Sequence, residues 1–215
     1  AECLERLSFA DELIVVLDIS GSMAGTSIHQ AKAAAALAIA KLDADDHLNV
    51  IVFNNNAKGL FAAPRIASPE NKATAQAFIE NLQAQGGTEM ASALDMALRG
   101  SAAPGSLRQV VFLTDGAVGN ESDLFDIIDR LLGGTRLFTV GIGSAPNSYF
   151  MVKASESGRG SYTHIGNTSE VDERMAALFA KLESPVVTDI TLLWPAGTAP
   201  DLSRAIMPDL YAGEP

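Results

Sequence analysis

Five residues with oxygen-bearing side chains are candidates for binding a metal ion. Asp18 and Asp115 each end an apolar run, and Ser20 and Ser22 follow the first aspartate at two-residue steps. Thr88 comes directly after two glycines. Carboxylate and hydroxyl oxygens without Cys or His suit Mg²⁺ or Mn²⁺ and also allow Ca²⁺, whereas zinc prefers sulfur and nitrogen ligands. The five residues therefore predict one divalent metal site, most suited to Mg²⁺, with positions left open to water or a ligand.

Each of these residues also has an ordinary structural interpretation. An aspartate after a strand often stabilises a turn or caps a helix, and Ser22 and Thr88 are both typical helix caps. Two carboxylates combined with three hydroxyls favour the metal site, because so many oxygens are hard to match by accident.

Glycines next to these side chains are expected to shape the loops that carry them. Gly21 allows the backbone between the two serines to curl inward. Gly87 precedes Thr88 and Gly116 follows Asp115, and both are expected to shape their loops as Gly21 does.

Apolar runs and helical spacing alternate along the chain. Buried strands are expected at residues 13–17, 47–53, 110–114, 136–142 and 161–165, with a short edge strand at 58–61. Helices are expected at residues 27–42, 71–82, 88–98, 122–132, 147–157 and 169–182.

This alternation predicts a Rossmann-like α/β fold. The sheet should be doubly wound and mostly parallel, with helices on both faces and a short antiparallel edge strand. In such sheets ligands bind beyond the carboxyl ends of the strands, where the winding direction reverses. Asp18 and Asp115 are therefore expected at one site.

The motifs resemble the metal-ion-dependent adhesion site of von Willebrand factor A domains. The matching residues are the run Asp18-x-Ser20-x-Ser22, Thr88 after Gly86-Gly87, and Asp115 in Thr114-Asp115-Gly116, over roughly residues 12–182. The resemblance implies a bound Mg²⁺ that takes a Glu or Asp side chain from a partner protein, without catalysis. It also implies that Thr88 and Asp115 exchange direct and water-mediated roles as the last helix shifts.

A narrower resemblance points to the A domains of inter-alpha-trypsin inhibitor heavy chains and their bacterial relatives. It is carried by Asp45-Asp46-His47, by Gly86 to Met90, by Thr114 to Glu121 and by the tail from Pro208 to Pro215. In that group the A domain lies between β-rich modules of secreted or surface proteins. An extracellular, cell-surface or periplasmic location is the implied expectation.

The end of the chain departs from the alternating pattern. Pro185 ends the last helix, and residues 186–193 form a further apolar run with no helix after it. We therefore expect an N-terminal lead-in over 1–11, the A domain over 12–183, and the start of a neighbouring β-rich region of a longer protein over 184–215.

The composition excludes two classes of partner. A formal net charge of -11 repels phosphate backbones, and no run of Lys or Arg offers an exception, so nucleic acid is not expected to bind. No apolar stretch reaches the roughly 18 residues of a membrane span, so this segment is not expected to insert into a membrane.

Two other function classes compete with the binding module. A Mg²⁺-dependent phosphatase would use Asp18 as nucleophile, but such enzymes need a general acid two residues on, where this chain has Ser20. The second alternative is a structural A domain that binds partners through another face; the complete set of five residues argues against it. We expect no enzymatic activity.

Overall fold

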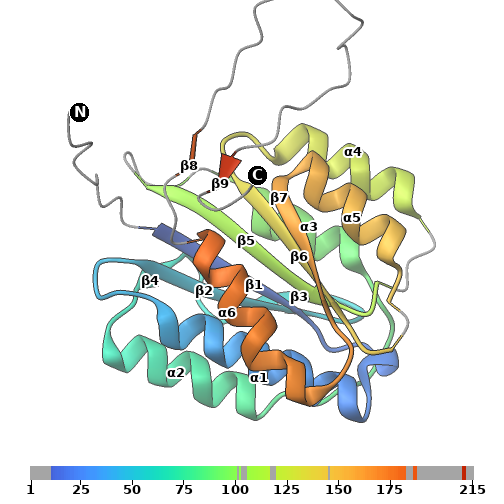
Figure 1. Ribbon diagram of the computed structural model, residues 1–215, viewed down its shortest axis with the longest axis horizontal. Coiled ribbons are helices and arrows are strands. Elements are labelled where there is room, and N and C mark those ends of the chain that lie inside the picture. Colours follow the sequence, from blue (N-terminus) through green and yellow to red (C-terminus); the bar gives the residue numbers. More distant parts are fainter. Residues whose placement is uncertain are drawn as a thin grey trace, which may run out of the picture.

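The chain forms a single-layered sheet with helices on both sides in a computed structural model (Figure 1). The structure describes residues 11–100, 102, 106–116, 120–144, 146–182, 186–187 and 210–211. Within these residues, no helix is long and apolar enough to cross a membrane.

Parallel strands make up most of the sheet. Its order is β3-β2-β1-β5-β6-β7, and β4 also pairs with β2. The parallel strands are β1 (Asp11–Asp18), β2 (His47–Phe53), β5 (Leu107–Thr114), β6 (Arg136–Ile142) and β7 (Arg159–Ile165). The predicted fold class is confirmed, and the bounds of β2 and β6 are those expected from their apolar runs.

Two short antiparallel strands cover the outer edge of β2. They are β3 (Ala57–Gly59) and β4 (Arg65–Ile66), of which only β3 was expected. Between them, the Asn49 side chain bonds both main-chain groups of Phe61, with Nδ2 donating to its carbonyl and Oδ1 accepting from its N–H, each over 3.1 Å. The outer edge of β2 is therefore covered by two short strands and the segment between them rather than by one long strand.

The helices form one layer on each face of the sheet (Figure 1). One layer consists of α1 (Thr26–Lys41), α2 (Pro69–Glu80) and α6 (Val171–Leu182). The other consists of α3 (Met90–Leu98), α4 (Glu121–Leu131) and α5 (Ser148–Ser157). The 3-10 turns η1 (Gly21–Met23) and η2 (Thr168–Glu170) precede α1 and α6.

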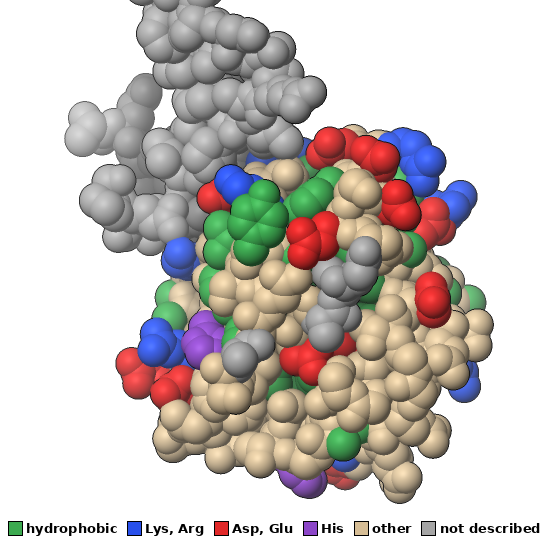
Figure 2. Space-filling view, turned by 90° about the vertical axis from the view of Figure 1, so that its right-hand side faces the viewer, with side chains coloured by type: hydrophobic (Ala, Val, Ile, Leu, Met, Phe, Trp, Pro, Cys, Tyr) green, Lys and Arg blue, Asp and Glu red, His purple; other side chains and the backbone are tan. Residues whose placement is uncertain are grey.

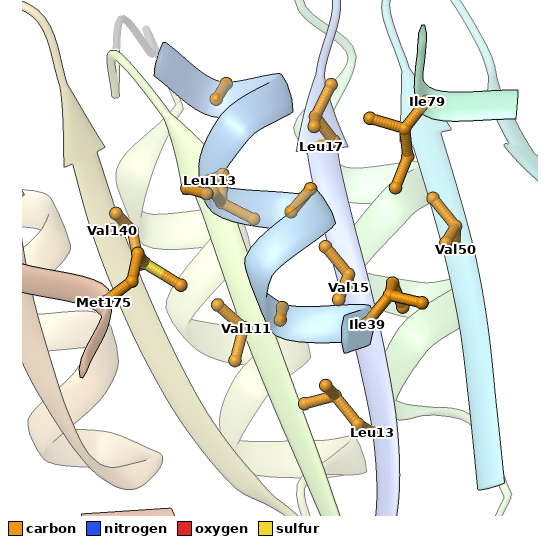
Figure 3. Close-up of a cluster of buried hydrophobic side chains, with 14 of the residues drawn as sticks. Leu13, Val15, Leu17, Ile39, Val50, Ile79, Val111, Leu113, Val140 and Met175 are labelled. Carbon is orange, nitrogen blue, oxygen red and sulfur yellow. The ribbon is translucent and has the colours of Figure 1, made fainter. Parts of the chain in front are cut away.

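The central strand contributes to an apolar core on each face. Leu13, Val15 and Leu17 pack on the α1 side with side chains such as Ile39 of α1 (Figure 3). Ile14 and Val16 point to the opposite core, under α3, α4 and α5. This double burial explains why β1 reads as a continuous apolar run, as central parallel strands do.

The starts of α2 and α3 each differ by two residues from the sequence-based expectation. α3 begins at Met90 rather than Thr88; Glu89 has a non-helical ψ of 71°, and its N–H donates to the Asn54 carbonyl over 2.6 Å. α2 begins earlier than expected, at Pro69, where Ser68 caps the helix by accepting from the Asn71 N–H.

The end of α6 is tied to the sheet, and the two described strands after it do not pair with that sheet. Gln109 Nε2 of β5 donates to the Leu182 carbonyl over 3.1 Å. β8 (Val186–Val187) and β9 (Leu210–Tyr211) pair with each other in a separate two-stranded sheet. The rest of the strand expected at 186–193, residues 1–10 of the lead-in, and most of 184–215 lie outside the described residues. The domain boundary near residue 183 stays a prediction.

Asp11 gives the fold a pH dependence. Burial, together with the negative charge of Asp46, raises the pKa of Asp11 to about 6. Because this pKa lies above the unfolded value near 3.9, ionisation of Asp11 costs stability as pH rises through about 6, and the cost is absent below about 4. We expect Asp11→Asn to stabilise the protein at pH 7.5 by about 1–2 kcal/mol, allowing for partial exposure.

Urea unfolding at pH 7.5 and pH 4.5 measures this effect. The difference between Asp11→Asn and wild type should shrink at the lower pH, whereas the exposed Asp129→Asn serves as control. A stability gain that is the same at both pH values would contradict the assignment to Asp11 ionisation.

Candidate metal site

The candidate site lies at the carboxyl ends of β1 and β5, where the strand order changes direction. The chain winds outward from β1 through β2 on one side, and from β5 through β6 and β7 on the other. The side chains that end the two adjacent strands therefore meet at one edge of the sheet, as in other open α/β sheets. Residues almost a hundred positions apart in sequence become neighbours.

Asp18 is fully buried at this edge, and both of its carboxylate oxygens are held. Oδ1 accepts from the Ser20 N–H over 2.7 Å, and Oδ2 accepts from Thr114 Oγ1 over 2.6 Å. The Thr114 oxygen in turn accepts from the Gly116 N–H over 2.9 Å. The carboxylate is thus fixed in one orientation before any ligand arrives.

The charge of Asp18 is only partly compensated. Burial raises its pKa, the hydrogen bonds from Thr114 and Ser20 lower it, and the negative charge of Asp115 raises it further, leaving the pKa above its ordinary value. Because Asp115 acts on this titration, the two carboxylates lie close enough to repel each other.

The two serines come together on the turn after β1. Ser20 Oγ and Ser22 Oγ lie 3.0 Å apart, with Ser20 buried and Ser22 exposed. The Gly21 N–H between them donates to the Gly86 carbonyl over 2.9 Å, and a Cβ at Gly21 would lie 3.2 Å from that oxygen. Glycine at this position therefore allows the close approach of the two loops.

The loop that carries Thr88 is joined to the serine turn. Besides the bond to Gly86, the Gln85 N–H donates to the Ile19 carbonyl over 2.8 Å. Thr88 follows as a half-buried loop residue. The structure thus brings the backbone of this loop beside the serine turn.

Asp115 lies on a loop that is anchored to the start of α5. It is half-buried, and its carbonyl accepts from the Asn147 N–H over 3.0 Å. Gly116 has a φ of +71°, and a Cβ there would lie 3.1 Å from the Asn147 Cβ. Gly116 is therefore needed both for its backbone conformation and for space.

These residues fit a hard divalent cation. In the part of the chain that the structure describes, no three His, Cys, Asp or Glu side chains form a group that could hold a metal. The site instead combines two carboxylates with hydroxyls, which is the donor set expected for Mg²⁺ and not for zinc. A cation here would also offset the mutual repulsion of Asp18 and Asp115.

The surface around the site is mostly uncharged. Figure 2 views the molecule toward the end of the sheet where β1 and β5 terminate, and acidic side chains appear near the middle of this face. Uncharged side chains and backbone surround them, and the Lys and Arg side chains visible in this view lie toward its edges.

The structural interpretation of Asp18 is also partly realised. Its bond to the Ser20 N–H, two residues on, is an Asx-turn, which stabilises the chain reversal after β1. Ser20, by contrast, precedes η1 without a side-chain capping bond. Asp18 therefore shapes the turn and also places a carboxylate at its centre.

Three further residues support the site and were not predicted from sequence. Thr114 orients Asp18, whereas Asn54 and Asn55 hold the loop before Thr88 through bonds to Gln85 and Gly87. A run of three asparagines directly after a buried strand was the available signal, since it places polar side chains at the carboxyl edge of the sheet.

Comparison with known proteins identifies the family. Residues 11–164 match the family model of the von Willebrand factor type A domain, and the chain belongs to this family. A von Willebrand factor A domain-containing protein of Dictyostelium discoideum is 31% identical over 192 residues, covering 89% of this chain and 21% of that protein. The von Willebrand factor A domain-containing protein 5B1 of Mus musculus is 31% identical over 207 residues, covering 94% of this chain and 17% of that protein.

Solved structures show the same fold. A von Willebrand factor type A protein from Catenulispora acidiphila superposes with a TM-score of 0.74 at 24% identity, covering 81% of this chain and 43% of that one. The PilB minor pilin from Streptococcus sanguinis gives a TM-score of 0.65 at 13% identity, over 82% and 62% of the two chains. This chain spans about a fifth of the length of the curated relatives it matches.

Thr114 provides a test of the buried hydrogen bonds around Asp18. Thr114→Val preserves shape but removes the hydroxyl that donates to Asp18 and accepts from Gly116. We expect a loss of about 1–3 kcal/mol in the free energy of unfolding, as for other buried polar groups left unpaired. Thr114→Ser, which keeps the hydroxyl, should lose clearly less in urea unfolding; equal losses would contradict the assignment of the effect to the missing hydroxyl.

Proposed function

We propose that this domain is a metal-ion-dependent protein-binding module that presents Mg²⁺ to a Glu or Asp side chain of a partner protein. The observation that carries the proposal is the buried, doubly hydrogen-bonded Asp18 beside Asp115 and two adjoining serine hydroxyls. Membership of the von Willebrand factor A family supports a role in protein interaction. The metal site and the acidic partner are proposed in addition to this general role of the family.

The five site residues would have two roles, coordination of the metal and supply of negative charge. Ser20, Ser22 and Thr88 would contribute neutral oxygens directly or through water, while Asp18 and Asp115 would supply negative charge. A divalent cation held mainly by neutral oxygens supplies a concentrated positive charge that attracts an external carboxylate. Direct coordination by Asp115 would weaken that attraction, so its role in the binding state should be water-mediated.

Local rather than long-range attraction should govern partner capture. The chain carries a formal net charge of -11, which does not steer an acidic protein toward it. Binding of an acidic side chain should therefore depend on short-range contact at the site, and salt should affect it less than a chelator does.

The phosphatase alternative finds little support at the site. Ser20 holds Asp18 through its backbone N–H and adjoins Ser22, so a serine hydroxyl stands where the carboxylic acid of a general acid would be needed. We propose that the domain has no enzymatic activity; turnover of a phosphate ester with Mg²⁺ would reverse this ranking. The structural alternative, binding through another face, would leave chelator-independent partner binding.

The wider context is also proposed. The neighbouring regions of the parent protein would be β-rich modules, and the location would be extracellular, cell-surface or periplasmic, as the narrower likeness to inter-alpha-trypsin inhibitor heavy chains implies. That likeness stays a prediction beside the family assignment.

Calorimetric titration with Mg²⁺ and Mn²⁺ tests the metal site. Wild type should bind one ion, and Asp18→Ala should weaken binding by more than the about 10–100-fold that loss of an outer-shell partner costs. Asp126→Ala, an exposed aspartate on α4, should bind like wild type. The proposal fails if wild type binds neither ion, or if Asp18→Ala binds as wild type does.

Thr88→Ala tests metal binding and metal-dependent partner binding separately. We expect Mg²⁺ affinity to fall only modestly, because the other oxygens remain, while Mg²⁺-dependent capture of a partner is abolished. Thr74→Ala, an exposed threonine on α2, is the matched control. Pull-down with Mg²⁺ and with EDTA measures the effect, and a partner retained in EDTA and by Thr88→Ala alike would show that the metal is not the binding element.

A further inference from the structure

The loop around Thr88 is held from both sides by the chain that follows β2. Asn54 Nδ2 donates to the Gln85 carbonyl over 3.0 Å, and the Asn54 carbonyl accepts from the Glu89 N–H over 2.6 Å. Between these two points, Asn55 Oδ1 accepts from the Gly87 N–H over 2.7 Å. The last bond holds the Gly86–Gly87 peptide unit, which lies one residue before Thr88.

Asn55 also fills the space beside Gly87. A Cβ at Gly87 would lie 2.7 Å from Asn55 Oδ1, which is closer than real Cβ atoms approach. Gly87 does not have a positive φ, so its backbone conformation alone does not require glycine. Gly86, by contrast, has a φ of +85°. The amide of Asn55 therefore occupies the space that a side chain at residue 87 would need.

We propose that Asn55 is a positioning residue of the metal site, acting through the Gly86–Gly87 peptide that leads into Thr88. This inference rests on the proposed function. The Thr88 loop is otherwise joined to the serine turn through Gln85 and Gly86, which precede Gly87. Without the bond to Asn55, Gly87 would have more conformational freedom between the flanking backbone bonds at Gly86 and Glu89. Asn55 removes that freedom.

The neutral amide suits a site that must keep its positive charge. An amide oxygen accepts the Gly87 N–H as a carboxylate does, but adds no negative charge beside the cation. Asn55→Asp keeps the acceptor, so it should preserve the loop. Its extra charge should maintain or raise Mg²⁺ affinity while reducing attraction for an external carboxylate. The amide thus contributes both position and neutrality.

The experiment compares Asn55→Ala, Asn55→Asp and Asn56→Ala by Mg²⁺ calorimetry and by hydrogen exchange of the Gly87 amide without metal. Asn56 is the matched control, because it is equally exposed and its side chain makes none of these loop contacts. We expect Asn55→Ala to weaken Mg²⁺ binding by about 10-fold, the size of an outer-shell effect. Its Gly87 amide should exchange faster, whereas Asn55→Asp and Asn56→Ala should retain wild-type protection and bind at least nearly as tightly.

A second pair of variants tests the contact itself. Gly87→Ala should weaken Mg²⁺ binding by displacing Asn55, and adding Asn55→Ala to it should cost little more, because both changes remove the same contact. Additive losses would contradict the contact. If wild type binds Mg²⁺ and Asn55→Ala binds it equally well, the inference is wrong and the proposed function stands. If wild type binds no Mg²⁺, the proposed function fails and the inference with it.

Discussion

The buried carboxylate of Asp18 is the constraint on which the rest of the site depends. It ends the central strand, where apolar neighbours exclude water, and it is repelled by Asp115. Such a group persists in a folded protein only if hydrogen bonds hold it, and Ser20 and Thr114 supply them. The turn after β1 and the end of β5 are therefore arranged around one charge, and the loops of Thr88 and Asp115 are in turn attached to these two segments.

The sequence predicted the elements whose signals are local. β2 and β6 were predicted at their observed bounds because a parallel strand buried on both faces is an unbroken apolar run. Asp18 and Asp115 could be assigned to one place because carboxyl ends of adjacent parallel strands share an edge. The family resemblance joined the serines and Thr88 to them.

The features that the sequence did not predict depend on contacts between distant segments. The loop before α3 extends to Glu89, whose N–H donates to the Asn54 carbonyl, a contact that helical spacing cannot report. β4 and β9, with two residues each, are too short to show any periodicity. In the sequence, Thr114 looks like an ordinary strand residue. Its role depends on the neighbouring strand β1, which places the Asp18 carboxylate next to its hydroxyl.

The closed outer edge of β2 has a consequence for how these molecules behave toward one another. A long, bare edge strand offers a row of main-chain donors and acceptors that another chain can extend into an aggregate. Here two short antiparallel strands pair with β2, the Asn49 side chain binds the main chain of Phe61 between them, and Lys58 adds an exposed positive charge to the edge. Strand addition from a second molecule should therefore be disfavoured along this side of the sheet.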